Sequence, residues 1–402
     1  MIRMPRRSPS KFGGGISLLW RGARSDQLRE LRTEALENAA AKPGQFVFES
    51  ARTALFHCLA ALGIGVGDEV VVCAFTCSAV TYGVQRSGAT VVYADINDDL
   101  TMNDAQVLAA VGPRTKAVIV QNTLGRLGLR RDTIEKLKAA GLFVIEDCAL
   151  SIGSVVDGKP HGSFGDVSIW SLELSKTLTL GWGGVLTVNA PALLAPIAKR
   201  VSGLRPIPAW RDRQRLAQLR FSVAAAAGGI PGGLIAWCLL YGSGLFRGSA
   251  DSETFAVTDR ALIGRETLAL FRALEKRTAE LFAKTNANYL ALLGAAKPRG
   301  LLVPVVQAPN EFVVTPRLPL ILEPAEISKI AAEAAVRGIE LGRWFDEAPP
   351  VPGLERARVA SDSNAKRISA RIVNFPCHWS LSEDEIRAMQ GLIEFLPRGA
   401  GR

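Results

Sequence analysis

The stretch RDTIEKLKAAGLFVIEDC, residues 131–148, contains two different hydrophobic periods in succession. RDTIEKLKAAG has the apolar spacing of an amphipathic helix, and LFVIEDC is a short apolar run typical of a buried strand. Further strand-like runs stand on both sides, at 69–75, 116–122, 166–172 and 184–189, with helical patterns between several of them. Strands that alternate with helices predict a mostly parallel sheet covered on both faces.

The length of 402 residues is sufficient for two domains. The α/β alternation fades after about residue 190, and the chain beyond 255 has an α+β pattern. We therefore predict a large domain over 1–255 and a smaller C-terminal domain over 256–402. The apolar fraction of 48% and the charged fraction of 21% indicate a globular protein.

The chain is basic, since lysine and arginine exceed aspartate and glutamate by 48 − 38 = 10. No basic run is interleaved with aromatic residues, so nucleic acid is the least expected partner. An anionic ligand and an ordinary solvated basic surface explain the charge equally well.

The six cysteines form no C-x-x-C pair and lie in apolar segments, which predicts buried free thiols in a reducing compartment. The three histidines are far apart and lack metal-ligand spacing, so no metal site is expected. Only a short apolar run follows the basic N-terminus, which argues against a signal peptide and favours the cytoplasm.

Two polar side chains follow strand-like runs. Asp147 ends LFVIED, and Lys176 lies 176 − 147 = 29 residues further on, after one more strand. Because ligands of open α/β sheets bind at the carboxyl ends of parallel strands, both side chains are expected to reach one crevice. Lys176 has apolar neighbours and a single nearby charge, Glu173. Either its stem lies along an apolar wall, or its amine loses its proton.

An amine and a carboxylate in one crevice suit pyridoxal phosphate. The aldehyde of this cofactor forms a Schiff base with a lysine, and its pyridine nitrogen needs a carboxylate. Its phosphate needs hydroxyls and the N–H groups of a helix N-terminus. The stretch ESARTAL, residues 49–55, provides a helix start capped by Ser50, and Ser171 provides a hydroxyl five residues before Lys176.

Five longer segments share features with one family. They are GVGDEVVVCAFTCSAVTYGVQRSGATVVYADI (65–96), PRTKAVIVQNTLG (113–125), GLFVIEDCALSIGS (141–154), GSFGDVSIWSLELSKTLTLGWGGVLTVN (162–189) and ARIVNFPCHWSLSEDEIRAM (370–389). Together they resemble the DegT/DnrJ/EryC1/StrS family of sugar aminotransferases, which depend on pyridoxal phosphate. The match is good over 45–190 and loose over 256–395. The resemblance implies fold type I of the pyridoxal phosphate enzymes, with helices on both faces of the sheet and a smaller α+β domain.

The resemblance also implies the site. Lys176 would hold the cofactor aldehyde, Asp147 the pyridinium nitrogen, and Ser171 with the amides of Ala51 and Arg52 the phosphate. The apolar surroundings of Lys176 would then disfavour its charged form. Active sites of this superfamily form between subunits, so a homodimer is implied.

Several family features are changed in this sequence. Cys77 stands where an aromatic residue usually stacks on the cofactor ring, and Leu150 stands where Gln or His usually bonds near O3′. Ala51-Arg52 replaces Gly-Thr, Trp182 replaces an acid, and the family's N-x-R segment has no counterpart. A changed substrate, a changed reaction and lost activity all stay open.

Residues 221–246 contain no charged residue, and arginines flank them on both sides. The length suits a membrane span of about 20 residues, but GGIPGG in the middle disfavours one straight helix. We expect one of two arrangements equally: a hairpin of two short helices at a membrane surface, or burial of the run against protein. A helix that crosses the membrane is less expected than either.

The function implied by the resemblance is transamination of a keto sugar, nucleotide-linked, to an amino sugar for polysaccharide or glycoconjugate biosynthesis. Glutamate is the expected amino donor. Another fold type I pyridoxal phosphate enzyme, a lyase or a dehydratase-like protein, is one alternative, although related dehydratases replace the lysine. A membrane-associated homologue with weakened catalysis is the other. We expect the cytoplasm, with or without peripheral contact with the inner face of the membrane.

Overall fold

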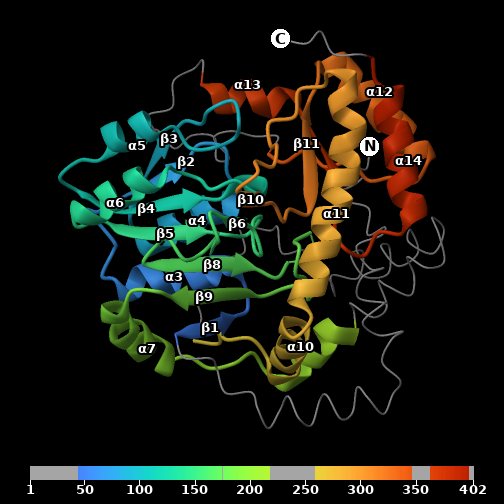
Figure 1. The fold of residues 1–402 in the computed structure, drawn as a ribbon. Coiled ribbons are helices and arrows are strands. Elements are labelled where there is room, and N and C mark those ends of the chain that lie inside the picture. The colour runs from blue at the N-terminus through green and yellow to red at the C-terminus, as the bar shows by residue number, and fades with distance from the viewer. Residues whose placement is uncertain (1–43, 174, 218–258, 346–362, 398–402) are drawn as a thin grey trace, which may run out of the picture.

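A computed structural model of the chain describes residues 44–173, 175–217, 259–345 and 363–397. Its centre is a seven-stranded sheet in the order β1-β9-β8-β5-β4-β2-β3 (Figure 1). The neighbours from β8 through β5, β4 and β2 to β3 are parallel, whereas β9 runs antiparallel to β8 and to β1. The strands span Gln45–Phe48 (β1), Glu69–Cys73 (β2), Thr90–Ala94 (β3), Thr115–Gln121 (β4), Phe143–Asp147 (β5), Val167–Ser171 (β8) and Gly184–Val188 (β9).

The central strands are buried on both faces. Val70, Val71 and Val72 of β2 are consecutive, so their side chains point alternately to opposite faces, and all three are buried. Two groups of helices provide the cover: α3, α4 and α7 pack together, and α5 packs on α6. These helices span Ala51–Ala61 (α3), Ser78–Ser87 (α4), Asp104–Ala110 (α5), Arg131–Ala139 (α6) and Leu194–Ser202 (α7). The predicted α/β architecture with a mostly parallel sheet is confirmed.

The later part of the chain has an α+β arrangement. A two-stranded antiparallel sheet of β11 (Arg317–Ile321) and β12 (Ile372–Pro376) packs beside α11 (Thr278–Ala296), which also contacts α14 (Glu383–Phe395) (Figure 1). The remaining helices are α10 (Arg265–Glu275), α12 (Pro324–Val336) and α13 (Asn364–Arg371). The predicted domain boundary near 255 and the apolar run 221–246 lie outside the described residues.

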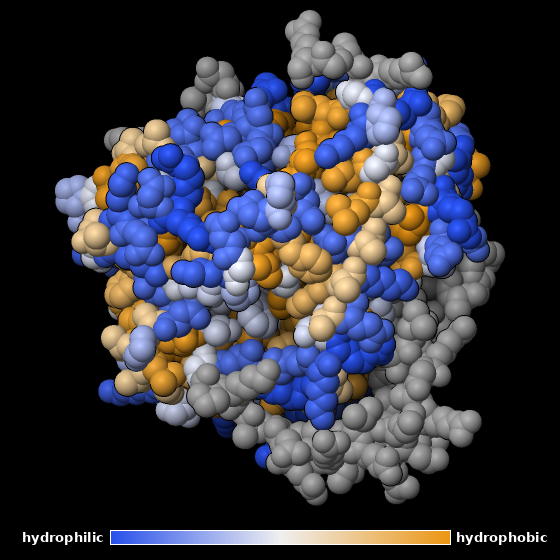
Figure 2. Space-filling model, viewed as in Figure 1, coloured by the Kyte–Doolittle hydropathy of each residue, from blue (hydrophilic) through white to orange (hydrophobic). Residues whose placement is uncertain are grey.

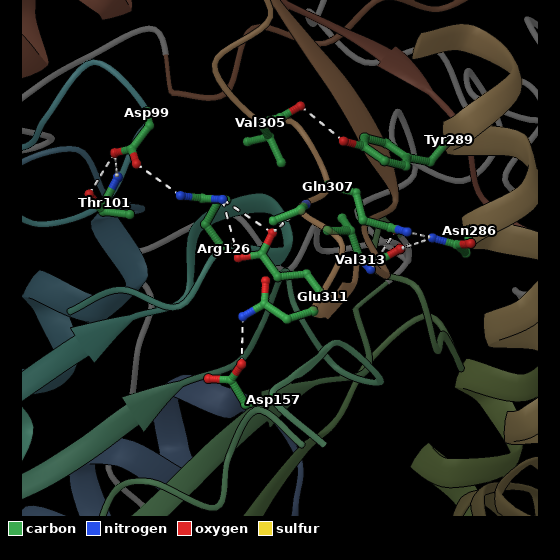
Figure 3. Close-up of polar contacts among 12 residues, drawn as sticks. Asp99, Thr101, Arg126, Asp157, Asn286, Tyr289, Val305, Gln307, Glu311 and Val313 are labelled. Carbon is green, nitrogen blue, oxygen red and sulfur yellow. Dashed lines mark hydrogen bonds and ion pairs between the residues drawn. The ribbon is translucent and has the colours of Figure 1, made fainter. Parts of the chain in front are cut away.

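Two junctions join this part to the sheet. Arg126, which follows the strand β4, pairs with Glu311 at 3.2 Å and with Asp99 at 3.0 Å (Figure 3). Glu311 begins the short strand β10 (Glu311–Phe312), which is paired with β6 (Val155–Val156). At the second junction, the carboxylate of Asp95 accepts hydrogen bonds from the first two N–H groups of α13, at 2.6 and 2.8 Å. At both junctions a charged side chain, Arg126 or Asp95, contacts the later part of the chain. We call the boundary between the two parts the seam.

On the face shown in Figure 2, apolar side chains gather over α11 and beside it, and Leu290 of that helix is exposed. Hydrophilic surface lies on either side of this band (Figure 2). Among the helices that the structure describes, none is both long enough and apolar enough to cross a bilayer. The cysteines follow the prediction of buried free thiols at 58, 73, 148 and 377, while Cys77 is half-buried.

Candidate active site

The candidate site lies at the carboxyl ends of the neighbouring strands β5 and β8. Asp147 is the last residue of β5 and pairs in register with Ile169 of β8, two residues before Ser171. The chain then forms a loop that returns as β9 and carries Lys176. This loop is closed by a hydrogen bond from the N–H of Leu180 to the carbonyl oxygen of Leu172, at 3.0 Å. The sheet therefore presents both predicted residues at one edge.

The apolar neighbours of Lys176 belong to the protein core. Leu172, Leu178 and Leu180 are buried and anchor the loop on both sides, while Lys176 itself stays half-buried. Within the described part of the chain, the Nζ atom of Lys176 makes no hydrogen bond and no ion pair. The scarcity of charges around this lysine thus follows from the burial of its flanks.

The environment of Asp147 is unusual for a carboxylate. Burial raises its pKa above the ordinary value, whereas the N–H of Ala149 and the charge of Lys176 lower the pKa. The Ala149 N–H donates to Oδ1 at 3.0 Å, and no other hydrogen bond reaches this carboxylate from the described residues. The pairing of β5 with β8 places Asp147 at the same edge of the sheet as the loop that carries Lys176, and the charge of Lys176 lowers the pKa of Asp147.

The start of the helix α3 and the hydroxyl-bearing residue Ser171 lie close to each other. Ser50 caps α3, its Oγ accepting a hydrogen bond from the N–H of Thr53 at 3.1 Å. Ser171 pairs in register with Gly184, and a Cβ atom added to Gly184 would lie 2.2 Å from the backbone nitrogen of Ala51. Ser171 is therefore next to the first turn of α3, where Ala51 and Arg52 are both half-buried. A helix N-terminus attracts anions.

The atypical residues occupy different surroundings. Cys77 is the N-cap residue of α4 and is half-buried, but its side chain does not cap the helix. Leu150 is 4% exposed and belongs to the core. The ring of Trp182 lies 5.8 Å from the guanidinium carbon of Arg215, so a cation contact has replaced the family's acid. Cys77 has no ring that could stack on the cofactor, and Leu150 has no group that could form a hydrogen bond near O3′.

The C-terminal part contributes residues that the sequence did not reveal. The ring of Trp344 lies 4.8 Å from Nζ of Lys176, and the buried Arg317 stacks on the same ring at 4.7 Å. Trp379 donates from its indole nitrogen to the carbonyl oxygen of Thr177, at 3.0 Å. Trp344 lies in no recognisable motif, and Trp379 was visible only as part of the closing segment 370–389.

The donor set fits pyridoxal phosphate at both ends. Lys176 offers an amine that makes no hydrogen bond to the described residues, and Asp147 offers a carboxylate whose burial favours a cationic partner. A protonated pyridine nitrogen is such a partner. The hydroxyl of Ser171 and the start of α3 suit a phosphate. The fit is weakest at the ring face, where Cys77 has no aromatic group to offer.

Comparison with known proteins finds similarity to one family. Residues 34–213 match the DegT/DnrJ/EryC1/StrS aminotransferase family. The UDP-N-acetyl-3-dehydro-alpha-D-glucosamine 3-aminotransferase of Acidithiobacillus ferrooxidans is 39% identical over 40% of this chain and 43% of its own length. The GDP-perosamine synthase of Vibrio cholerae is 34% identical over 44% of this chain and 48% of its own length. The chain thus matches less than half the length of these relatives.

Solved structures extend the likeness to the whole fold. The aminotransferase TlmJ from Streptoalloteichus hindustanus has a TM-score of 0.68 at 19% identity, covering 96% of this chain and 95% of that one. A DegT DnrJ EryC1 StrS aminotransferase from Brucella abortus has the same TM-score and identity, covering 95% and 93%. At this identity the likeness concerns the fold. Residues 34–213, the segment that matches the DegT/DnrJ/EryC1/StrS aminotransferase family, include every predicted site residue.

Proposed function

We propose that the protein is an aminotransferase that depends on pyridoxal phosphate and converts a keto sugar, nucleotide-linked, to an amino sugar. Glutamate is the proposed amino donor, and polysaccharide or glycoconjugate biosynthesis is the proposed setting. The observation that carries the proposal is the placement of Asp147 and Lys176 at one edge of the sheet, with the charge of Lys176 acting on Asp147. The relatives named as sugar aminotransferases support the substrate class.

Each residue has a distinct task in this proposal. Pyridoxal phosphate supplies an electron-accepting ring that stabilises negative charge on a neighbouring carbon. Asp147 would hold the protonated ring nitrogen, and Ser171 with the N–H groups of Ala51 and Arg52 would hold the phosphate. Lys176 would bind the aldehyde and then, once displaced by the donor, take the proton from the donor's α-carbon as a general base. The amine suits this role because no described carboxylate pairs with it.

A second candidate is a different reaction of the same cofactor, such as a lyase or dehydratase-like reaction. It is favoured by the buried Leu150, an apolar side chain where the family pattern implies a group that bonds near O3′. Product analysis separates the two candidates, because only transamination converts glutamate to 2-oxoglutarate while the sugar gains nitrogen.

We also propose a cytoplasmic homodimer with peripheral contact to the inner face of the membrane. Trp210 is 63% exposed, the guanidinium of Arg211 lies 5.3 Å from its ring, and the sequence continues into the uncharged run 221–246. An exposed tryptophan beside arginines suits an anionic lipid surface. Co-sedimentation with phosphatidylglycerol vesicles tests the membrane contact. If the fraction of protein bound to membrane is unchanged after deletion of 221–246, the proposed contact is wrong.

Light scattering of the purified protein tests the proposed homodimer by its mass.

The central experiment is absorbance spectroscopy of the purified protein with added pyridoxal phosphate. We expect a visible band that Lys176→Ala abolishes and that glutamate bleaches. A panel of nucleotide-linked keto sugars should then restore the band and yield amino sugars by mass spectrometry. A protein that shows no band, or a band that survives Lys176→Ala, would rule the proposed function out.

A further inference from the structure

One tryptophan from the C-terminal part lies against the candidate lysine. The ring centre of Trp344 is 4.8 Å from Nζ of Lys176 and 4.7 Å from the guanidinium carbon of Arg317. Both distances are within the range of attraction between a cation and an indole ring. Trp344 is half-buried, whereas Arg317 is only 2% exposed. One aromatic ring is thus shared by two cationic side chains.

The position of Trp344 is set by its own backbone. Gly342 exchanges two backbone hydrogen bonds with Asn374 of β12, at 2.9 and 2.8 Å. The side chain of Asn374 then accepts a third bond from the N–H of Trp344, at 2.6 Å. A Cβ atom at Gly342 would lie 2.7 Å from the guanidinium of Arg317, so a larger residue there would displace that side chain. The ring is therefore held in place independently of Lys176.

The next residue fastens this segment to the sheet. Phe345 packs edge-on against Phe75, with ring centres 5.3 Å apart. Phe75 comes after β2 and two positions before Cys77, where the family pattern implies an aromatic residue. An aromatic ring in contact with the lysine thus comes from the C-terminal part of the chain. This arrangement provides a ring at the site although Cys77 provides none.

We propose that Trp344 is the positioning residue for Lys176. The face of its indole attracts the ammonium group and holds it at the sheet edge without an ion pair. A carboxylate at salt-bridge distance would retain both the amine and its proton, whereas an indole attracts the cation weakly and accepts no proton. The permanent charge of Arg317 keeps the ring oriented while the lysine moves away. The proposal rests on the proposed function, because it concerns how Lys176 is presented to an aldehyde.

The test compares three variants, Trp344→Leu, Trp344→Phe and Trp210→Leu. The first removes the ring, the second keeps one, and the third removes an exposed tryptophan elsewhere as a matched control. The first measurement is the rate at which apo-protein captures pyridoxal phosphate, followed by visible absorbance. We expect Trp344→Leu to slow capture about two- to fivefold, in line with the strength of a cation–indole contact. Trp344→Phe should retain most of the wild-type rate, and Trp210→Leu all of it.

The second measurement needs no cofactor. Apo-protein is labelled with a trace of acetic anhydride, and peptide mass spectrometry compares Lys176 with the exposed Lys116 as internal reference. We expect Lys176 to react faster in Trp344→Leu than in the wild type, because the amine has lost its contact with the ring. If Trp344→Leu does not fold, as judged by circular dichroism, Trp344→Met replaces it.

The outcomes separate this proposal from the proposed function. Equal effects of Trp344→Leu and Trp344→Phe, or no change in the labelling of Lys176, would overturn the role of the ring. If the wild-type protein does not bind pyridoxal phosphate at all, the proposed function is wrong. In that case the labelling of Lys176 would still show whether Trp344 contacts the amine.

Discussion

The indole N–H of Trp379 donates a hydrogen bond to the carbonyl oxygen of Thr177, at 3.0 Å and across 202 positions of sequence. Thr177 directly follows Lys176, and both Trp379 and Thr177 are buried. The loop that carries the lysine is therefore tied to the segment that follows β12. The geometry of the candidate amine depends on the docking of the C-terminal part as much as on the sheet.

Trp379→Phe should weaken both stability and cofactor binding. The change keeps a ring but removes the donor, so the buried carbonyl of Thr177 loses its partner, at a cost of about 1–3 kcal/mol. Urea denaturation should show that loss in the free energy of unfolding. Titration with pyridoxal phosphate should show a larger dissociation constant, which means weaker binding. The exposed Trp210→Phe serves as the control, and equal behaviour of the two variants would contradict the argument.

Asp147→Asn should stabilise the apo-protein while damaging the site. Burial raises the pKa of Asp147 above its ordinary value of 3.8, so the ionised carboxylate destabilises the fold at all pH values above its folded pKa. The amide removes this penalty, and the gain in unfolding free energy should be full at pH 7. The gain should vanish as the pH falls below 3.8, where the folded and unfolded carboxyl groups are both protonated. Denaturation at a series of pH values checks the sign.

The same variant should transfer amino groups roughly 100-fold more slowly, as is typical when one preorganised electrostatic group is removed. Single-turnover absorbance with glutamate measures this rate. A variant that is both less stable at neutral pH and fully active would contradict the assignment of Asp147.

Gly184→Ala should disturb the phosphate end of the site. The new Cβ atom would lie 2.2 Å from the nitrogen of Ala51, so α3 or β9 must shift, at a cost of about 1–3 kcal/mol. We expect the affinity for pyridoxal phosphate to fall more than the affinity for unphosphorylated pyridoxal, because the helix start moves away from Ser171. Gly294→Ala, where nothing lies within 4 Å, is the matched control and should be neutral or slightly stabilising.

Arg126→Ala should loosen the junction shown in Figure 3. The change leaves Glu311 and Asp99, which lie 3.2 and 3.0 Å from the guanidinium, without their cation. The group is partly exposed, so solvent screening limits the expected loss to roughly 1–2 kcal/mol of unfolding free energy. A double-mutant cycle with Glu311→Ala isolates the pairwise energy. The exposed pair Arg387–Asp384 provides a comparison that is expected to contribute much less, because water and salt screen it.

The sequence predicted the parts of the molecule whose signals are local. Alternating strand and helix patterns predicted the sheet, and the position of Asp147 at the end of a buried run placed it at the carboxyl edge. The sequence also predicted Ser50 as the N-cap of a helix and Ser171 near the end of a strand before the lysine. Both could be predicted because helix caps and strand ends depend on neighbouring residues. The roles of Lys176, Asp147, Ser171, Ala51 and Arg52 stay predictions that the variants above test.

The contacts that cross the seam were not predictable in this way. The ring of Trp344 contacts both Lys176 and Arg317, although the three residues are far apart in the sequence. Strand β10 has two residues and pairs with β6 across the seam. Two residues are too few to show the alternating apolar and polar pattern by which a strand is recognised in a sequence. At Cys77 the sequence showed only that the family's usual aromatic residue is missing, and it gave no sign that another segment brings a ring close to the lysine. In this chain the ring next to the lysine comes from residue 344 instead.

The late position of Trp344 and Trp379 has a consequence for biosynthesis. A ribosome makes the strands that carry Asp147 and Lys176 long before it makes either tryptophan. During that interval the amine lacks the indole that will orient it and the bond that will fix its loop. Efficient cofactor capture is therefore expected only after the segment with the two tryptophans has been made, and completion of the sheet alone is not sufficient.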